Sequence, residues 1–262
     1  IVIQSIFESL QNRDLSMPYK YLIAAMLGNL ISQDKSAIIN DETFKEIMPI
    51  LLSVSIEMFD QSNDINDPDS SIFGEVFTAI FDHISIESIQ ALISPLMENL
   101  QSPAHIYNVL LLLDSYLYKI DDMLGDLNQV LVPILVACFQ SNHPALRYEA
   151  SYIFASHSII SESLDPESRC KIITLILEII TKGNSFYYGL KVVLELVQAM
   201  ENTDCLFELL LPFCLELINT GKDVNKFGWD ILISLFELSN NVPEDASQQM
   251  CSYCLEILKN QP

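Results

Sequence analysis

Glycine and basic residues are scarce in this sequence. Of 262 residues only 7 are glycine, and 13 lysines and arginines stand against 35 aspartates and glutamates. With so few glycines we expect no glycine-rich loop that could cradle a phosphate group. The formal net charge of −22 disfavours direct contact with nucleic acid and with anionic membranes, because both are themselves polyanions.

The excess of acidic residues has two interpretations. It predicts proteins with basic segments as partners, because a strong negative field raises the rate at which they encounter the chain. It can equally serve only to keep the chain in solution, since half of the residues are hydrophobic.

Cysteines and long apolar runs are also limited. Six cysteines in a chain of this length do not predict a disulfide framework, and they favour a reducing compartment. The longest apolar run, from Val130 to Phe139, is about half as long as the ~20 residues that a membrane-spanning helix needs. We therefore expect a soluble intracellular protein with no segment inserted in a membrane.

No group of residues has the spacing of an active site or a metal centre. Cys251-Ser-Tyr-Cys254 has the spacing of half a zinc site, but no second cysteine or histidine pair completes four ligands. We expect these two cysteines to pack within a helix. The four histidines are scattered and match no metalloprotease or catalytic-triad signature. The expectation is a protein without catalytic residues, metal or cofactor.

Helical periodicity runs from end to end. Apolar residues recur at spacings of three and four, as in Phe44, Ile47, Leu51, Val54 and Met58. No segment shows the sustained alternation of a strand bounded by hairpin turns. Short clusters of Asn, Asp, Ser, Gly and Pro separate the helical stretches. This pattern predicts an all-α fold.

The helical stretches also repeat. Aligned segments share one slot that recurs every 38 to 46 residues, occupied by Ser5, Pro49, Pro95, Pro133, Thr174, Pro212 and Ser252. A proline inside a helix costs roughly 3 kcal/mol, so four prolines at one register by accident are improbable. We expect a bend shared by the first helix of every unit.

Each unit continues into a second helix after a short turn. The predicted second helices are Pro18–Ser32, Ser70–Ile84, Pro103–Ile120, Pro144–Ile160, Ser185–Met200 and Asp223–Ser239. A seventh first helix, Glu244–Lys259, has no partner. We therefore expect one continuous array of about six helix pairs over residues 1–262. Because it starts at Ile1 and both ends lie inside helical patterns, we expect a piece of a longer chain.

The repeat resembles the HEAT family. Its unit has two helices of this length, a proline in the first, and a Val-Arg-x-x-Ala-type start to the second. The best match is His143-Pro144-Ala145-Leu146-Arg147-Tyr148-Glu149-Ala150 followed by Ile153 and Phe154. The other second helices keep the apolar register but lack the arginine. The resemblance implies a right-handed superhelix of antiparallel helix pairs that binds other proteins.

The stacking of such units predicts a concave binding surface. In HEAT arrays the second helices line it, so their non-core positions are candidate partner-binding residues. These are Asp82, Asp114, Tyr118, Glu149, Tyr152, Lys191 and Glu195. Acidic and tyrosine side chains suit a segment rich in lysine or arginine, although solvated helix faces have the same composition.

Trp229 is a further candidate in the sixth pair. It lies off the apolar stripe of its helix, beside Asn225, Asp230 and Glu237. On the side of a groove it could stack on a cation of a basic peptide. The alternative is that it seals the junction with the seventh unit.

An acidic stretch inside the second unit is the last candidate. It holds Asp60, Asp64, Asp67 and Asp69 and no basic residue. It is similar to the acidic loop within a repeat of importin-β receptors, which helps to bind the small GTPase Ran or cargo. The alternative is an ordinary solvated loop.

Two classes of function follow from the resemblance. One is an importin-β-like nuclear transport receptor, cytoplasmic and nuclear, that binds basic cargo, Ran and nucleoporin repeats. The other is a non-transport HEAT scaffold, such as a phosphatase scaffold or a chromosome- or vesicle-associated assembly subunit. Irregular units and strong acidity favour the first, because phosphatase scaffolds have regular units and arginine ladders.

Overall fold

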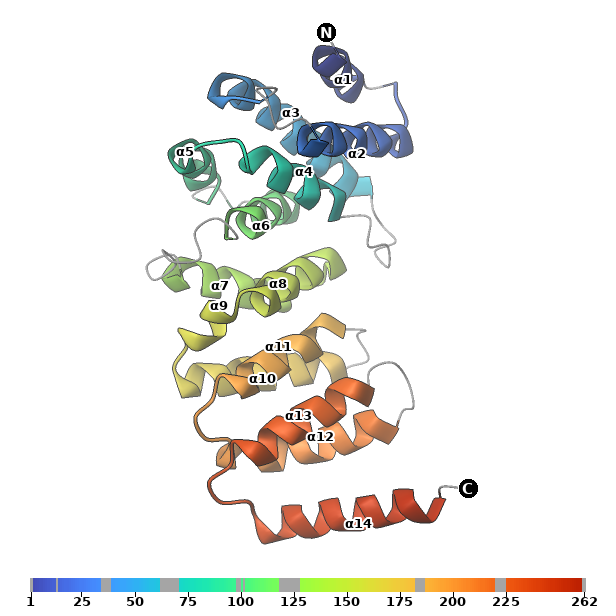
Figure 1. Ribbon diagram of the computed structural model, residues 1–262, viewed down its shortest axis with the longest axis vertical. Helices are drawn as coiled ribbons and strands as arrows, with labels where there is room; N and C mark the ends of the chain where they lie inside the picture. The colour runs from blue at the N-terminus through green and yellow to red at the C-terminus, as the bar shows by residue number, and fades with distance from the viewer. Residues whose placement is uncertain are drawn as a thin grey trace. The chain divides into compact units, whose positions relative to one another are not determined.

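The computed structural model is built from helices throughout the part of the chain that it describes (Figure 1). The described residues are 2–12, 14–33, 39–61, 71–97, 100, 102–117, 128–181, 187–219 and 225–260. Within these ranges no residue belongs to a β-strand, so the prediction of an all-α fold is confirmed. The helices fall into two compact units, one of residues 1–127 and 141–153 and the other of residues 128–140 and 154–262.

The first unit stacks its second helices one on another. Its elements are α1 (Val2–Gln11), α2 (Met17–Gln33), α3 (Asp41–Gln61), α4 (Ser71–Phe81), α5 (Ile86–Met97), α6 (Pro103–Leu117) and most of α8 (Pro144–Ser156). Helix α4 contacts α2 on one side and α6 on the other, while α3 and α5 pack against α6. Every residue of α6 from Tyr107 to Leu117 is buried as a result.

The second unit repeats this arrangement. Its elements are α7 (Asn128–Phe139), α9 (Ser158–Glu162), α10 (Pro166–Thr181), α11 (Tyr187–Gln198), the 3-10 turn η3 (Asp204–Leu206), α12 (Phe207–Asn219), α13 (Asn225–Glu237) and α14 (Glu244–Asn260). Helices α11 and α13 contact each other, and each packs on its own first helix, α10 or α12.

The four repeated prolines all lie inside helices. Pro49, Pro95, Pro133 and Pro212 belong to α3, α5, α7 and α12. The predicted apolar stripe of α3 is also confirmed where it is described, since Phe44, Ile47, Leu51 and Val54 are buried. At the HEAT-like match Leu146, Ala150, Ile153 and Phe154 are buried, as the alignment predicts.

Three details differ from the expectation. The helix predicted over Pro144–Ile160 breaks at His157, whose φ of −122° and ψ of 86° are not helical. The break lets the carbonyls of Ser161 and Glu162 accept hydrogen bonds from the buried Arg169, at 3.0 Å each. Asp60 belongs to α3, which extends to Gln61. Cys251 is exposed on α14 rather than packed.

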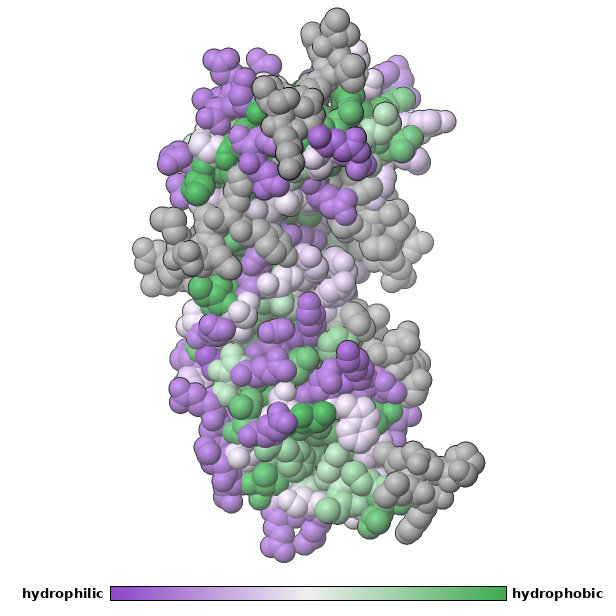
Figure 2. Space-filling model, viewed as in Figure 1, coloured by the Kyte–Doolittle hydropathy of each residue, from purple (hydrophilic) through white to green (hydrophobic). Residues whose placement is uncertain are grey.

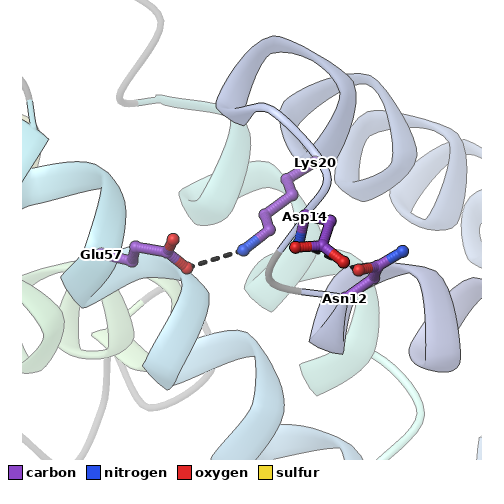
Figure 3. A network of polar contacts seen from close by, with 4 residues as sticks. All are labelled: Asn12, Asp14, Lys20 and Glu57. Carbon is purple, nitrogen blue, oxygen red and sulfur yellow. Dashed lines mark hydrogen bonds and ion pairs between the residues drawn. The ribbon is translucent and has the colours of Figure 1, made fainter.

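Two of the few basic residues, Arg169 and Lys20, are buried and make polar contacts between helices. Arg169 also donates to the carbonyl of Ala199, so one guanidinium serves carbonyls at the ends of α9 and α11. Lys20 of α2 is 2% exposed, and its ammonium lies 2.7 Å from a carboxylate oxygen of Glu57 on α3 (Figure 3). Pairing offsets the free energy that burial of a charge costs.

Helix α2 exposes apolar side chains to solvent. Tyr19, Leu22, Met26 and Leu30 recur at spacings of three and four and are all exposed. The helix contains no acidic residue, and Figure 2 shows apolar side chains at the surface over it. Contiguous exposed apolar surface on a folded chain is typical of a contact site for another protein. Among the described helices, none combines the length and the hydrophobicity that a membrane span requires.

Close approach of α13 to α12 depends on Gly228. A Cβ atom at this position would lie 2.8 Å from Cγ1 of Ile218 and 3.1 Å from the carbonyl oxygen of Cys214. We expect Gly228→Ala to lower stability by about 1–3 kcal/mol, because the helices must separate. Gly74→Ala is the matched control, since its Cβ would meet only Leu111 Cδ2, at 4.0 Å.

The control should raise stability slightly, by about 0.5–1 kcal/mol, because alanine favours a helix interior over glycine. Thermal unfolding followed by circular dichroism measures both variants. Equal shifts of the two midpoints would contradict the close approach at Gly228.

Candidate functional site

An acidic pocket lies among three second helices of the first unit. Its volume is about 460 Å³. Four carboxylic side chains line it, Glu75 and Asp82 from the α4 segment, Asp114 from α6 and Glu149 from α8. Thr78, Tyr148 and Tyr152 supply further polar groups, and Ser32 closes the α2 side. None of the described residues that line the pocket is basic.

Helical spacing explains why these side chains meet. Glu75, Thr78 and Asp82 are separated by three and four residues and therefore share one face of the α4 segment. Tyr148 and Tyr152 are four residues apart on α8, and their rings lie nearly parallel at 5°, with centroids 6.4 Å apart. The pocket therefore has carboxylic side chains from the α4 segment, α6 and α8, and aromatic rings from α8.

The start of α8 is held by contacts within the same unit. The His143 ring lies 5.2 Å from the ring of Phe59 on α3, and Phe59 also packs on Tyr107 of α6. Arg147 donates from Nη1 to the carbonyl of Ser141 at 2.6 Å. Arg147, the arginine of the HEAT-like match, thus stabilises the turn that precedes α8.

Two of the carboxylic side chains that line the pocket, those of Asp114 and Glu149, are buried. Asp114 is 8% exposed and Glu149 is 5% exposed. Burial raises the pKa of Glu149 to about 8, and the negative charge of Asp114 adds to the rise. At neutral pH Glu149 therefore holds its proton most of the time. An added cation would favour ionisation of Glu149 and gain a second carboxylate partner.

Four of the predicted residues converge in this pocket, namely Asp82, Asp114, Glu149 and Tyr152. Their convergence was not predicted, and neither were Glu75, Thr78 and Tyr148. The spacing of Glu75 from Asp82, seven residues, was the available signal, because it places both on one helix face. Tyr118, Asp64, Asp67 and Asp69 lie outside the described residues, as does the side chain of Asp60.

The predicted residues of the second unit lie on α11 and α13. Glu195 on α11 is half-buried, and burial raises its pKa while the charge of Lys191 lowers it. On α13, Asn225 and Asp230 are half-buried and Glu237 is exposed. Trp229 is half-buried, with its ring 6.3 Å from that of Tyr253 on α14. This contact favours the interpretation that Trp229 seals the junction with the seventh unit.

Within the described ranges no three His, Cys, Asp or Glu side chains are grouped so that they could hold a metal ion. Cys251 and Cys254 lie on α14, exposed and half-buried respectively.

Comparisons with known proteins add little to this geometry. Neither a protein-family model nor a curated protein matches the sequence. A solved structure of an engineered protein is similar over 91% of this chain and 98% of its own, with 13% identity and a TM-score of 0.46.

The raised pKa of Glu149 predicts a specific pH dependence of stability. The folded pKa of about 8 exceeds the ordinary value of 4.5. The folded state therefore binds the proton more tightly, so the contribution of Glu149 to stability is fully present below about pH 4.5 and is lost as the pH rises towards about 8. The expected loss from this group is on the order of 1 kcal/mol per pH unit within that window.

Glu149→Gln isolates the effect, because glutamine keeps the shape and cannot ionise. The variant should match the parent near pH 5 and be more stable at pH 8. Denaturant unfolding at several pH values gives the free energy of unfolding of each protein. In the difference between the two proteins, the contributions of titrating groups that do not interact with Glu149 cancel. Parallel curves for the two proteins would show that Glu149 is ionised in the folded state.

Proposed function

We propose that this chain is a protein-binding HEAT-type repeat array whose acidic pocket receives a lysine or arginine side chain from a basic segment of a partner protein. The observation that carries the proposal is the buried pair of Asp114 and Glu149. Two adjacent buried carboxylic acids cost folding free energy, and an inserted cation would offset that cost.

The shape and composition of the pocket support an arginine or lysine as occupant. Its walls offer carboxylate oxygens from α4 and α6, which can accept hydrogen bonds from a guanidinium or an ammonium. The rings of Tyr148 and Tyr152 offer π faces, on which a guanidinium stacks favourably. The net charge of −22 would steer basic segments towards the chain.

The exposed apolar stripe of α2 supports protein binding in a second way. Tyr19, Leu22, Met26 and Leu30 lie in the same unit as the pocket. A partner segment that combines basic and apolar residues would find a complementary surface for each kind of side chain within this unit.

Binding of a designed basic peptide tests the pocket directly. The probe is a fluorescent peptide of alternating arginine and glycine, and its control replaces arginine by glutamine. We expect only the arginine peptide to bind, and Asp114→Asn to weaken it by about tenfold or more, because a charged hydrogen-bond partner is lost. Fluorescence anisotropy over a salt series gives the affinities.

Glu208→Gln is the matched variant, since it removes one exposed carboxylate from α12 in the other unit. It should change the affinity less than twofold. If Asp114→Asn and Glu208→Gln weaken binding equally, only the net charge matters and the pocket is not the site.

Within this class we propose a nuclear transport receptor of the importin-β type. The support is the resemblance of the repeats, the strong acidity and the acidic stretch that contains Asp64, Asp67 and Asp69. The alternative is a HEAT scaffold outside transport, for which the same pocket would hold a basic segment of an assembly partner.

A pull-down separates these two. GTP-locked Ran and phenylalanine-glycine nucleoporin repeats are each presented to the immobilised chain, with GDP-loaded Ran as the control. A transport receptor should retain Ran in its GTP form and the nucleoporin repeats. Failure of both to bind would remove the transport proposal while leaving the basic-segment pocket to its own test.

A further inference from the structure

We propose that Cys170 and Cys205 form a redox-responsive dithiol, closed to an intramolecular disulfide by a small-molecule disulfide such as oxidised glutathione. The two sulfur atoms lie 3.9 Å apart, although 35 residues separate them in the chain. Cys170 belongs to α10 and Cys205 to η3, both in the second unit. The proposal is independent of the pocket in the first unit.

The two sulfur atoms need only a small movement to reach the distance of a disulfide bond. A disulfide has a sulfur–sulfur distance of about 2.05 Å, so the two atoms must approach by about 1.8 Å. Rotation of two surface side chains can supply a movement of this size. Cys205 is exposed and Cys170 half-buried, so a soluble oxidant can reach the pair.

The other cysteines contrast with this pair. Cys138 and Cys214 are buried, and burial raises the pKa of each thiol to about 12. Both therefore stay protonated and unreactive at neutral pH. Burial also raises the pKa of Cys170, which makes Cys205, the more exposed thiol, the first to react.

Hydrogen bonds hold the backbone next to each cysteine. Arg169, the neighbour of Cys170, donates to the carbonyls of Ser161, Glu162 and Ala199. On the other side Thr203 donates from Oγ1 to the carbonyl of Leu235 at 2.6 Å. Asp204, the neighbour of Cys205, accepts hydrogen bonds from the Ser239 hydroxyl and from the amides of Asn240 and Asn241. These contacts fix the segments on either side of the pair, whose sulfur atoms lie 3.9 Å apart.

The exchange proceeds in two steps. The Cys205 thiolate attacks one sulfur of glutathione disulfide, which releases one glutathione thiolate and leaves a mixed disulfide on Cys205. The Cys170 thiolate then attacks the Cys205 sulfur and releases the second glutathione. Two protein thiols lose two protons and two electrons, and one glutathione disulfide is reduced to two glutathiones.

The disulfide would join α10 to η3 and enclose α11 in a covalent loop. Closing a loop lowers the entropy of the unfolded chain, so the oxidised second unit should unfold at a higher temperature. Reduction should reverse the change completely.

Thiol counting and peptide mapping test the proposal on the whole chain. Oxidised glutathione should lower the number of titratable thiols, measured after denaturation, from six to four. Mass spectrometry of the unreduced digest should find the Cys170–Cys205 linkage, and the thermal midpoint should rise by several degrees. Dithiothreitol should restore all six thiols.

Two variants separate this pair from a competing one on α14. Cys205→Ser should abolish both the loss of two thiols and the thermal shift. The double variant Cys251→Ser/Cys254→Ser should keep both effects, with thiols falling from four to two. Retention of all thiols, stable glutathione adducts without an internal bond, or a linkage between Cys251 and Cys254 would each overturn the proposal.

Discussion

Close packing of second helices within each unit, α2 on α4 and α4 on α6 in the first and α11 on α13 in the second, is the constraint on which the rest of the structure depends. Gly28 permits the close contact of α2 with Val76 of α4, where an added Cβ would lie 3.1 Å from Cγ2 of Val76. Because α6 is thereby enclosed by α3, α4 and α5, its residues from Tyr107 to Leu117 are all buried. Any polar side chain on such an enclosed helix lies in a low-dielectric environment. Asp114 is buried for this reason.

The acidic pocket follows from the same packing. Helices α4 and α6 pack against each other, and the polar positions that they and α8 present to the pocket are mostly acidic. Separated on a solvated surface, the carboxyl groups would have little influence on one another. Burial of Glu149 beside the charge of Asp114 raises its affinity for a proton, which a basic side chain would replace under the proposed function. Burial of these two carboxylic acids thus lowers the stability of the free protein. Under the proposed function the same two groups would favour binding of a cation.

Local signals predicted the helices and their boundaries to within a few residues. Spacings of three and four mark the buried faces, and Asn or Asp caps with proline mark the turns, so both can be found without knowing the fold. The break at His157 was missed because its reason, the carbonyl contacts of Arg169, lies beyond the local window. Likewise Asp82, Asp114, Glu149 and Tyr152 were recognised singly. Their meeting in one cavity depends on how α4, α6 and α8 are rotated, which periodicity does not specify.

In this glycine-poor chain, side chains of two aspartates accept hydrogen bonds at helix ends. Asp165 accepts from the amide and hydroxyl of Ser168 at the start of α10, and Asp204 accepts from the residues that end α13. These hydrogen bonds lower the pKa of both aspartates. Their contribution is present above the ordinary pKa of aspartate and disappears as the pH falls through the lowered value. The two connections that Asp165 and Asp204 stabilise are therefore sensitive to acid, whereas apolar contacts carry no titrating group, so strong acid should weaken these two connections before it disrupts the packing of the helices.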